Sequence, residues 1–72
     1  MLVTHQASFD DWLRLMRGEY LESPGLHLTT KQAERLWGLD TSTCHALLAA
    51  LVVAHFLRRT KDGAYTRIGA AG

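Results

Sequence analysis

The chain has 72 residues, so it holds one small domain, and such a domain is marginally stable unless nearly every element packs. Its single cysteine excludes an internal disulfide. The net charge of +1 is uneven, because residues 1–25 hold two basic against four acidic residues (−2) and residues 26–72 hold six against three (+3). This asymmetry favours a polyanionic partner for the C-terminal part.

Two features argue against a membrane or secreted protein. The longest apolar run, residues 47–54, is far too short to span a bilayer. The first residues, MLVTHQAS, lack a charged segment followed by an apolar one, so no signal peptide is expected. We therefore expect a cytoplasmic protein with no membrane partner.

The first predicted helix begins after Ser8, because residues 1–7 show no period and are expected to form a flexible arm. Ser8 and Asp11 have the spacing of a capping box. Proline and glycine within residues 23–25 predict the end of this helix. One helical stripe is formed by Phe9, Leu13, Met16 and Tyr20.

A short extended segment, residues 26–28, precedes the second predicted helix. Thr29 and Gln32 form another capping box, and Gly38 stands where a left-handed residue ends a helix. The apolar stripe of this helix consists of Ala33, Leu36 and Trp37. We expect both tryptophans, Trp12 and Trp37, in the core.

The third predicted helix is capped by Asp40 or Thr41. Its inward positions, spaced i, i+3, i+4 and i+7, are Cys44, Leu47, Leu48 and Leu51. A second apolar row consists of Ala46, Ala50 and Val53. Together the two rows predict a helix packed against two others, with Cys44 as a small buried apolar group.

The C-terminal part has the pattern of a β-hairpin. Two short runs of β-favouring residues, 56–60 and 64–68, flank Asp62-Gly63, a frequent hairpin turn. The turn is either a two-residue type I′ loop or a type I turn with Gly63 as the left-handed bulge residue. The two differ by one residue in register, so either Arg58 or Arg59 faces outward. Residues 69–72 are expected to be a frayed tail.

The order helix, short strand, helix, helix, strand, strand predicts a fold that is mainly α with a small β-sheet. Pairing of residues 26–28 with the hairpin would complete a winged helix-turn-helix domain, a three-helix bundle plus a β-hairpin wing, spanning residues 8–68.

Residues 24–67 carry a resemblance to a family. The stretch L-T-x-x-Q-A-x-R-L-W-G-L-D, residues 28–40, followed by F-L-R-R-T-x-D-G, residues 56–63, resembles small bacterial winged helix-turn-helix domains, whose members are mostly uncharacterised. These are similar to the DNA-binding cores of bacterial transcription regulators, which implies double-stranded DNA as the partner. This chain departs from them in having His55 where glycine is frequent after the long helix, and in lacking arginines on that helix.

The candidate DNA-binding residues follow from placing the third helix in the major groove and the hairpin on the flanking backbone. Hydroxyl and imidazole groups at the helix start would reach base edges, and basic side chains on both sides would bind phosphates. Without arginine on this helix, we expect modest sequence specificity. The candidates are Thr41, Ser42, Thr43 and His45 on the third helix, Lys31 and Arg35 on the second, and Arg58, Arg59, Lys61 and Arg67 on the hairpin.

No catalytic triad, paired carboxylates or metal-ligand spacing is present in the sequence, and three short helices with a hairpin are expected to leave little volume for a substrate cleft. We therefore expect neither enzyme activity nor a cofactor, metal or small-molecule substrate. The alternative function is a protein-interaction or dimerisation module without DNA binding. It would use the row of Ala46, Ala50 and Val53, or a homodimer surface on the first helix with Trp12 and Leu15 exposed.

Overall fold

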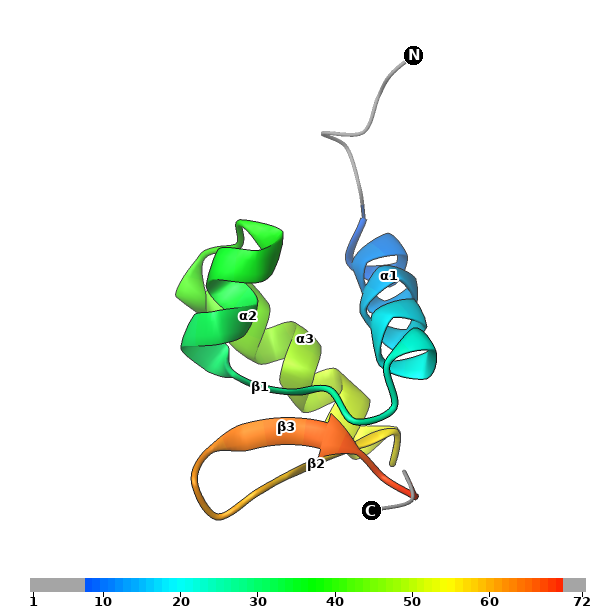
Figure 1. Cartoon of the computed structure of the whole chain (residues 1–72). Helices are drawn as coiled ribbons and strands as arrows, with labels where there is room; N and C mark the ends of the chain where they lie inside the picture. Colours follow the sequence, from blue (N-terminus) through cyan, green and yellow to red (C-terminus); the bar gives the residue numbers. More distant parts are fainter. Residues whose placement is uncertain (1–7, 70–72) are drawn as a thin grey trace.

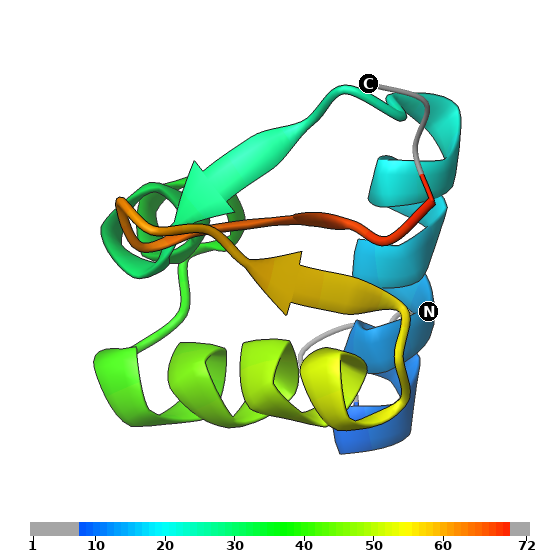
Figure 2. The same cartoon turned by 90° about the horizontal axis from the view of Figure 1, so that it is seen from below.

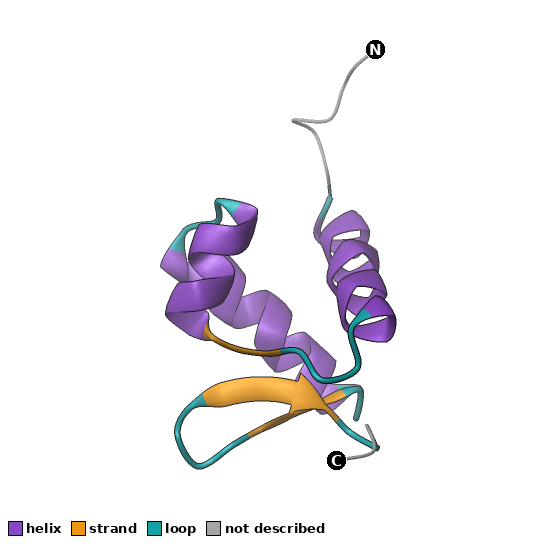
Figure 3. Ribbon diagram, viewed as in Figure 1, coloured by secondary structure: helices purple, strands orange, loops and turns teal. Residues whose placement is uncertain are grey.

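A computed structural model describes residues 8–69, which form three helices and one three-stranded antiparallel sheet (Figures 1 and 3). This confirms a mainly α fold with a small β-sheet. The predicted arm, residues 1–7, and most of the predicted tail, residues 70–72, lie outside the described residues. The elements are α1 (Phe9–Glu22), β1 (His27–Thr29), α2 (Thr30–Trp37), α3 (Thr41–Val53), β2 (Leu57–Arg59) and β3 (Ala64–Arg67).

The helix starts are set by the short-range hydrogen bonds that the sequence predicts. Before α1, the Asp11 N–H donates to the Ser8 hydroxyl and the Ser8 N–H donates to the Asp11 carboxylate, both at 3.1 Å. Before α2, the N–H of Thr29 donates to Gln32 at 2.9 Å and the N–H of Gln32 donates to Thr29 at 3.2 Å. Asp40 caps α3 by accepting from the backbone N–H of residue 43, which decides between the two predicted caps.

The turn between α2 and α3 is also the predicted one. Gly38 ends α2 with φ of 65°, a left-handed conformation that glycine adopts without steric cost. The two helices meet at a bend of 111°. Among residues 8–69 no single helix is long and apolar enough to cross a membrane, and only this bent pair has the length and composition.

The sheet has β3 in the centre, so the hairpin pairs with β1 as predicted. β3 runs antiparallel to both neighbours, and the strand order is β1-β3-β2. In Figure 2 the strands cross the view, with α3 along one side of the sheet and α1 at its right-hand end. The central strand therefore fixes where both ends of the hairpin lie.

The hairpin turn is the bulge alternative. Residues 60–63 join the strands, and the N–H of Gly63 donates to the Thr60 carbonyl at 3.0 Å. Gly63 has φ of 86°, the left-handed bulge conformation. The Thr60 hydroxyl accepts from the N–H of Ala64 at 3.0 Å, which holds the first pair of the hairpin together.

The register decides how the two hairpin arginines are oriented. Arg59 lies opposite Tyr65, which is buried, and Arg58 lies opposite Thr66. Because paired residues share a sheet face, Arg58 is on the face away from the core. Arg59 is on the core-side face near the turn, yet both arginine side chains are exposed.

One core joins the helices to the sheet. A hydrogen bond from the Tyr20 hydroxyl to the Tyr65 carbonyl, at 2.9 Å, ties α1 to β3 inside it. Burial raises the pKa of Tyr20 to about 12, with a smaller contribution from Cys44. The predicted inward row of α3 is confirmed, since all four members are buried. The core residues are Met16, Tyr20, Ala33, Cys44, Leu47, Leu48, Leu51, Leu57 and Tyr65.

Several predicted core positions are wrong, because short helices bury only a narrow stripe. Phe9 is 47% exposed at the start of α1, and Leu36 is 55% exposed, since α2 packs on α3 mainly through Ala33. On α3 only Ala50 of the second apolar row is half-buried: Val53 is 78% exposed and Ala46 is also exposed. Trp12 and Trp37 are only partly buried against the core.

The corner between α3 and β2 is tight although it lacks glycine. His55 has φ of 61°, a left-handed conformation that is uncommon for a residue with a side chain. Its N–H donates to the Val52 carbonyl at 2.9 Å, and the Phe56 N–H donates to the Leu51 carbonyl at 3.0 Å. This pair of bonds is the Schellman arrangement that closes a helix.

Tyr20→Phe should destabilise the domain by roughly 1–3 kcal/mol, because the buried hydrogen bond to the Tyr65 carbonyl is lost. Thermal or urea unfolding followed by circular dichroism measures this. Since the folded pKa of Tyr20 is raised, its stabilising effect is present below the ordinary tyrosine pKa and disappears as the pH rises towards about 12. The Phe variant should show a smaller loss of stability over that alkaline range, and an unchanged alkaline profile would contradict the assignment.

His55→Gly should stabilise the domain by roughly 0.5–1 kcal/mol, because glycine adopts the left-handed conformation without the steric cost that histidine carries. For a domain of this size, each kcal/mol raises the melting temperature by about 4–8 °C. The matched control is Ala54→Gly, whose φ of −77° needs no glycine and whose melting temperature should fall. A lower melting temperature for His55→Gly would show that the histidine side chain stabilises the corner.

Candidate nucleic-acid interface

Three segments meet on one side of the molecule: the start of α2, the start of α3 and the hairpin turn. Thr29, directly before α2, pairs with Ala64, directly after the turn. The thiol of Cys44, in the first turns of α3, contacts the carbonyl of Thr30 at 3.7 Å. Figures 1 and 2 show the turn, α2 and the beginning of α3 together at the left, with α1 at the right. The fold thus brings together two of the segments expected to hold phosphates and the helix end expected to approach bases.

Most of the positive charge lies on this side. All five basic residues here are exposed, and three acidic residues accompany them, which gives a net of +2. The basic residues, named the basic face from here on, are Lys31, Arg35, Arg58, Arg59 and Lys61. The acidic residues are Glu34, Asp40 and Asp62. The other described charges, three basic and four acidic on α1 and at the end of β3, sum to −1.

Arg67 does not join the basic face. It is opposite Leu57 at the base of the hairpin, three ladder positions from the turn-closing pair of Thr60 and Ala64. It is also only half exposed. The structure therefore separates Arg67 from the other hairpin cations.

The start of α3 carries a negative charge as well as hydroxyl groups. Hydrogen bonds from Thr43, through its side chain and its N–H, and from the Ser42 hydroxyl hold the pKa of Asp40 below its usual value. The Asp40 carboxylate is fully exposed, so it is ionised and solvated at neutral pH. A phosphate approaching this helix start would meet the negative charge of Asp40, which weakens the expected attraction between the helix end and the DNA backbone.

The exposed face of α3 carries no lysine, arginine, aspartate or glutamate. Thr41, Ser42 and His45 are exposed, whereas Thr43 is half-buried. Ala46 continues this face towards the C-terminal end. Cys44 is buried, and burial together with nearby Glu34 and Asp40 raises its thiol pKa, so it is not a reactive thiolate.

The hairpin turn is rigidly held. The Thr60 hydroxyl donates to the Asp62 carboxylate, which lowers the pKa of Asp62, with a smaller contribution from His27. Arg58, Arg59 and Lys61 flank this carboxylate and are exposed. The turn thus presents a hydrogen-bonded backbone with exposed cationic side chains around it.

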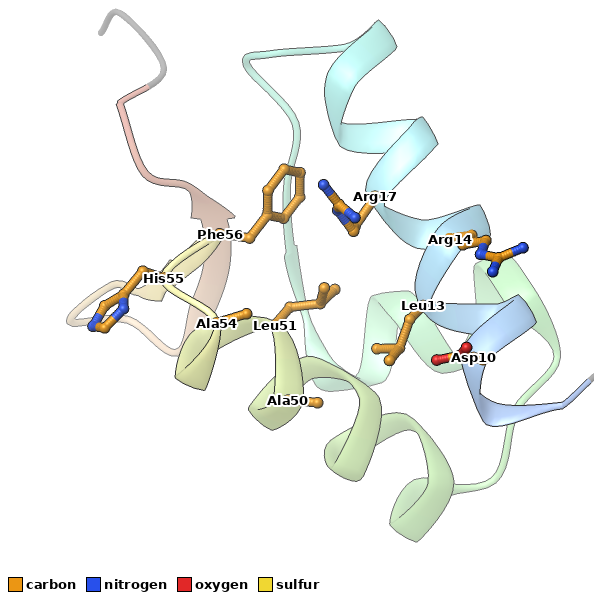
Figure 4. A pocket seen from close by; sticks show the side chains of 9 residues that line it. All are labelled: Asp10, Leu13, Arg14, Arg17, Ala50, Leu51, Ala54, His55 and Phe56. Atoms are coloured by element: carbon orange, nitrogen blue, oxygen red, sulfur yellow. The ribbon is translucent and has the colours of Figure 1, made fainter.

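A cleft on the opposite side was not anticipated, and the expectation of little cleft volume is wrong. It lies between α1 and the end of α3, measures about 410 Å³ and has Leu13 and Leu51 in its lining. Figure 4 shows Arg17 turned towards Phe56, with its guanidinium 5.2 Å from the ring centre, while Arg14 and His55 point away. The size is within the range of small-ligand sites. Its charged side chains do not converge on a common point, however.

No metal site is formed by the described residues, since no group of three or more His, Cys, Asp or Glu side chains among them could hold an ion. Comparison with protein-family models, with curated proteins and with solved structures found no match to this chain.

Proposed function

We propose that the domain is a winged helix-turn-helix protein that binds double-stranded DNA, as a transcriptional regulator or an accessory factor without enzyme activity. The observation that carries this proposal is the meeting of the α3 start with the basic face. Further support comes from the 111° bend between α2 and α3, within the usual range for helix-turn-helix pairs. The strand order with β3 in the centre is compatible with a hairpin wing.

In this mode of binding, the start of α3 enters the major groove and the basic face contacts phosphates beside it. Lys31 and Arg35 are one turn apart on α2 and contact the phosphates of one DNA strand. Arg58, Arg59 and Lys61 contact the phosphates of the DNA backbone that lies beyond the hairpin turn. Because phosphate contacts carry no sequence information and α3 has no arginine, affinity comes mainly from the backbone and specificity is modest.

Salt dependence tests this proposal directly. If four or five basic side chains contact phosphates, the affinity for duplex DNA should fall about a hundredfold or more between 50 and 200 mM salt, by counterion release. Fluorescence polarisation with a labelled duplex of mixed sequence measures this. Absence of binding at low salt would overturn the proposal.

Arg59→Gln should weaken DNA binding several-fold and make its dependence on salt shallower by about one counterion, because one phosphate contact is lost. Arg67→Gln is the matched control, since it removes the same charge from the far end of the same hairpin. It should leave the salt slope nearly unchanged. Equal effects of the two substitutions would mean that only net charge matters and that the turn is not in contact with DNA.

Asp40→Asn should strengthen DNA binding several-fold at low salt, since it removes a negative charge that repels a phosphate at the start of α3. Asparagine is also a good helix cap, so the melting temperature should change little. The control is Asp10→Asn, which makes the same change on α1. An equal gain for both variants, or none for Asp40→Asn, would place the start of α3 away from the backbone.

A second candidate function is association with another protein or a second copy. The exposure of Val53 and Ala46 on α3 favours it, because apolar side chains on an uncovered helix face are frequent at interfaces. On α1, Leu15 is exposed but Trp12 is partly buried against the core, so the homodimer surface with both exposed is incomplete. Such association would persist as ionic strength rises, unlike DNA binding.

A further inference from the structure

The exposed first half of α3 has a restricted chemistry. Thr41, His45, Ser42 and Ala46 are all exposed, and helical steps of 100° place them in that order across one face. Hydroxyl and imidazole groups occupy the middle, and methyl groups of Thr41 and Ala46 lie at the two sides. The Ser42 hydroxyl already donates to Asp40 at 3.1 Å, so its role as a donor is occupied.

The side chains on this face of α3 exclude most of the direct hydrogen bonds by which proteins recognise guanine and adenine. Guanine is read by arginine or lysine and adenine by asparagine or glutamine, and α3 contains none of these between Thr41 and Val53. The side-chain amide oxygen of Gln32 on α2 accepts a hydrogen bond from the N–H of Thr29. The thymine C5-methyl group, by contrast, is read by apolar contact with threonine or alanine.

Asp40 is a competing reader beside the hydroxyl groups of Thr41 and Ser42, because a carboxylate accepts from the cytosine amino group and hydroxyls can bond to several base edges. One of its oxygens, Oδ2, already accepts from both the N–H of Thr43 and the hydroxyl of Ser42. The other oxygen keeps acceptor capacity, so a test has to separate the methyl contact from contact with the amino group.

We propose that α3 selects thymine-rich duplex DNA through the C5-methyl groups in the major groove, with Thr41 and Ala46 as the contacting residues. This inference rests on the proposed DNA-binding function. The two residues are five positions apart, about 7.5 Å along the helix axis, which corresponds to roughly two base-pair steps. The methyl groups recognised are therefore on thymines about two steps apart.

The experiment uses two pairs of duplexes of equal length, and the two members of each pair differ only in the C5-methyl group of the pyrimidine. One contains A·T pairs, and the second has deoxyuridine in place of every thymidine. The third contains G·C pairs, and the fourth has 5-methylcytosine in place of every cytosine. Within each pair the donors and acceptors are the same, so Asp40 cannot produce a difference. Binding of the whole chain is followed by fluorescence polarisation at low salt.

Burying one methyl group changes an equilibrium constant by about fourfold, so two contacts should favour thymine over uracil by roughly fifteenfold. Methylated cytosine should likewise bind more tightly than cytosine. Thr41→Ser removes one methyl and keeps the hydroxyl, so the ratio of thymine to uracil affinity should fall to about fourfold. Thr66→Ser, the same change on β3, should leave the ratio unchanged.

Equal affinity for the thymine and uracil duplexes, with clear binding to both, would overturn this inference and leave the DNA-binding proposal intact. An unchanged ratio in Thr41→Ser would overturn the assignment of Thr41. Failure to bind any of the four duplexes at low salt would instead overturn the proposed function itself.

Discussion

The central position of β3 is the constraint on which the arrangement of the domain depends. Pairing on both edges ties this strand to β1 and β2, and the hydrogen bond from Tyr20 to the Tyr65 carbonyl ties it to α1. Because Ala64 begins β3 and pairs with Thr29 at the start of α2, the turn of the hairpin must lie beside that helix. A one-residue slip of β3 would turn Tyr65 out of the core and move the turn relative to α2. The candidate interface therefore exists only in this register.

The local features of the fold could be predicted from the sequence because each depends on contacts within a few residues. The two capping boxes, the Gly38 helix end and the buried α3 row follow rules of spacing. Exposure of Leu36 and Val53 could not be predicted in that way, since it depends on how far the sheet and α1 extend over each helix. The choice between the two hairpin registers also needed the pairing of β3 with β1.

The same distinction applies to the candidate interface. Charge asymmetry in the sequence indicated the basic hairpin, and the exposure of Arg58, Arg59 and Lys61 agrees with it. The sequence alone does not show how far each hairpin residue lies from the turn. The prediction therefore placed Arg67 with the other hairpin cations, whereas the strand pairing separates it from them. The cleft between α1 and α3 has no motif, because its walls come from residues far apart in the sequence, such as Leu13 and Leu51, which are 38 positions apart (51 − 13). Contact across such a separation is decided by packing alone.

Asp40 shows how stability and binding compete at one residue. An uncharged asparagine would cap α3 about as well, so the negative charge is not required for the helix to start. Its carboxylate is held by Thr43 and Ser42, which orders the first turn but uses polar groups that could otherwise contact DNA. Repulsion between this charge and a phosphate limits how deeply the helix start can lie against the backbone. If the domain binds DNA, its affinity must then come from the long, flexible side chains of the basic face, and its discrimination from the uncharged groups that remain on α3.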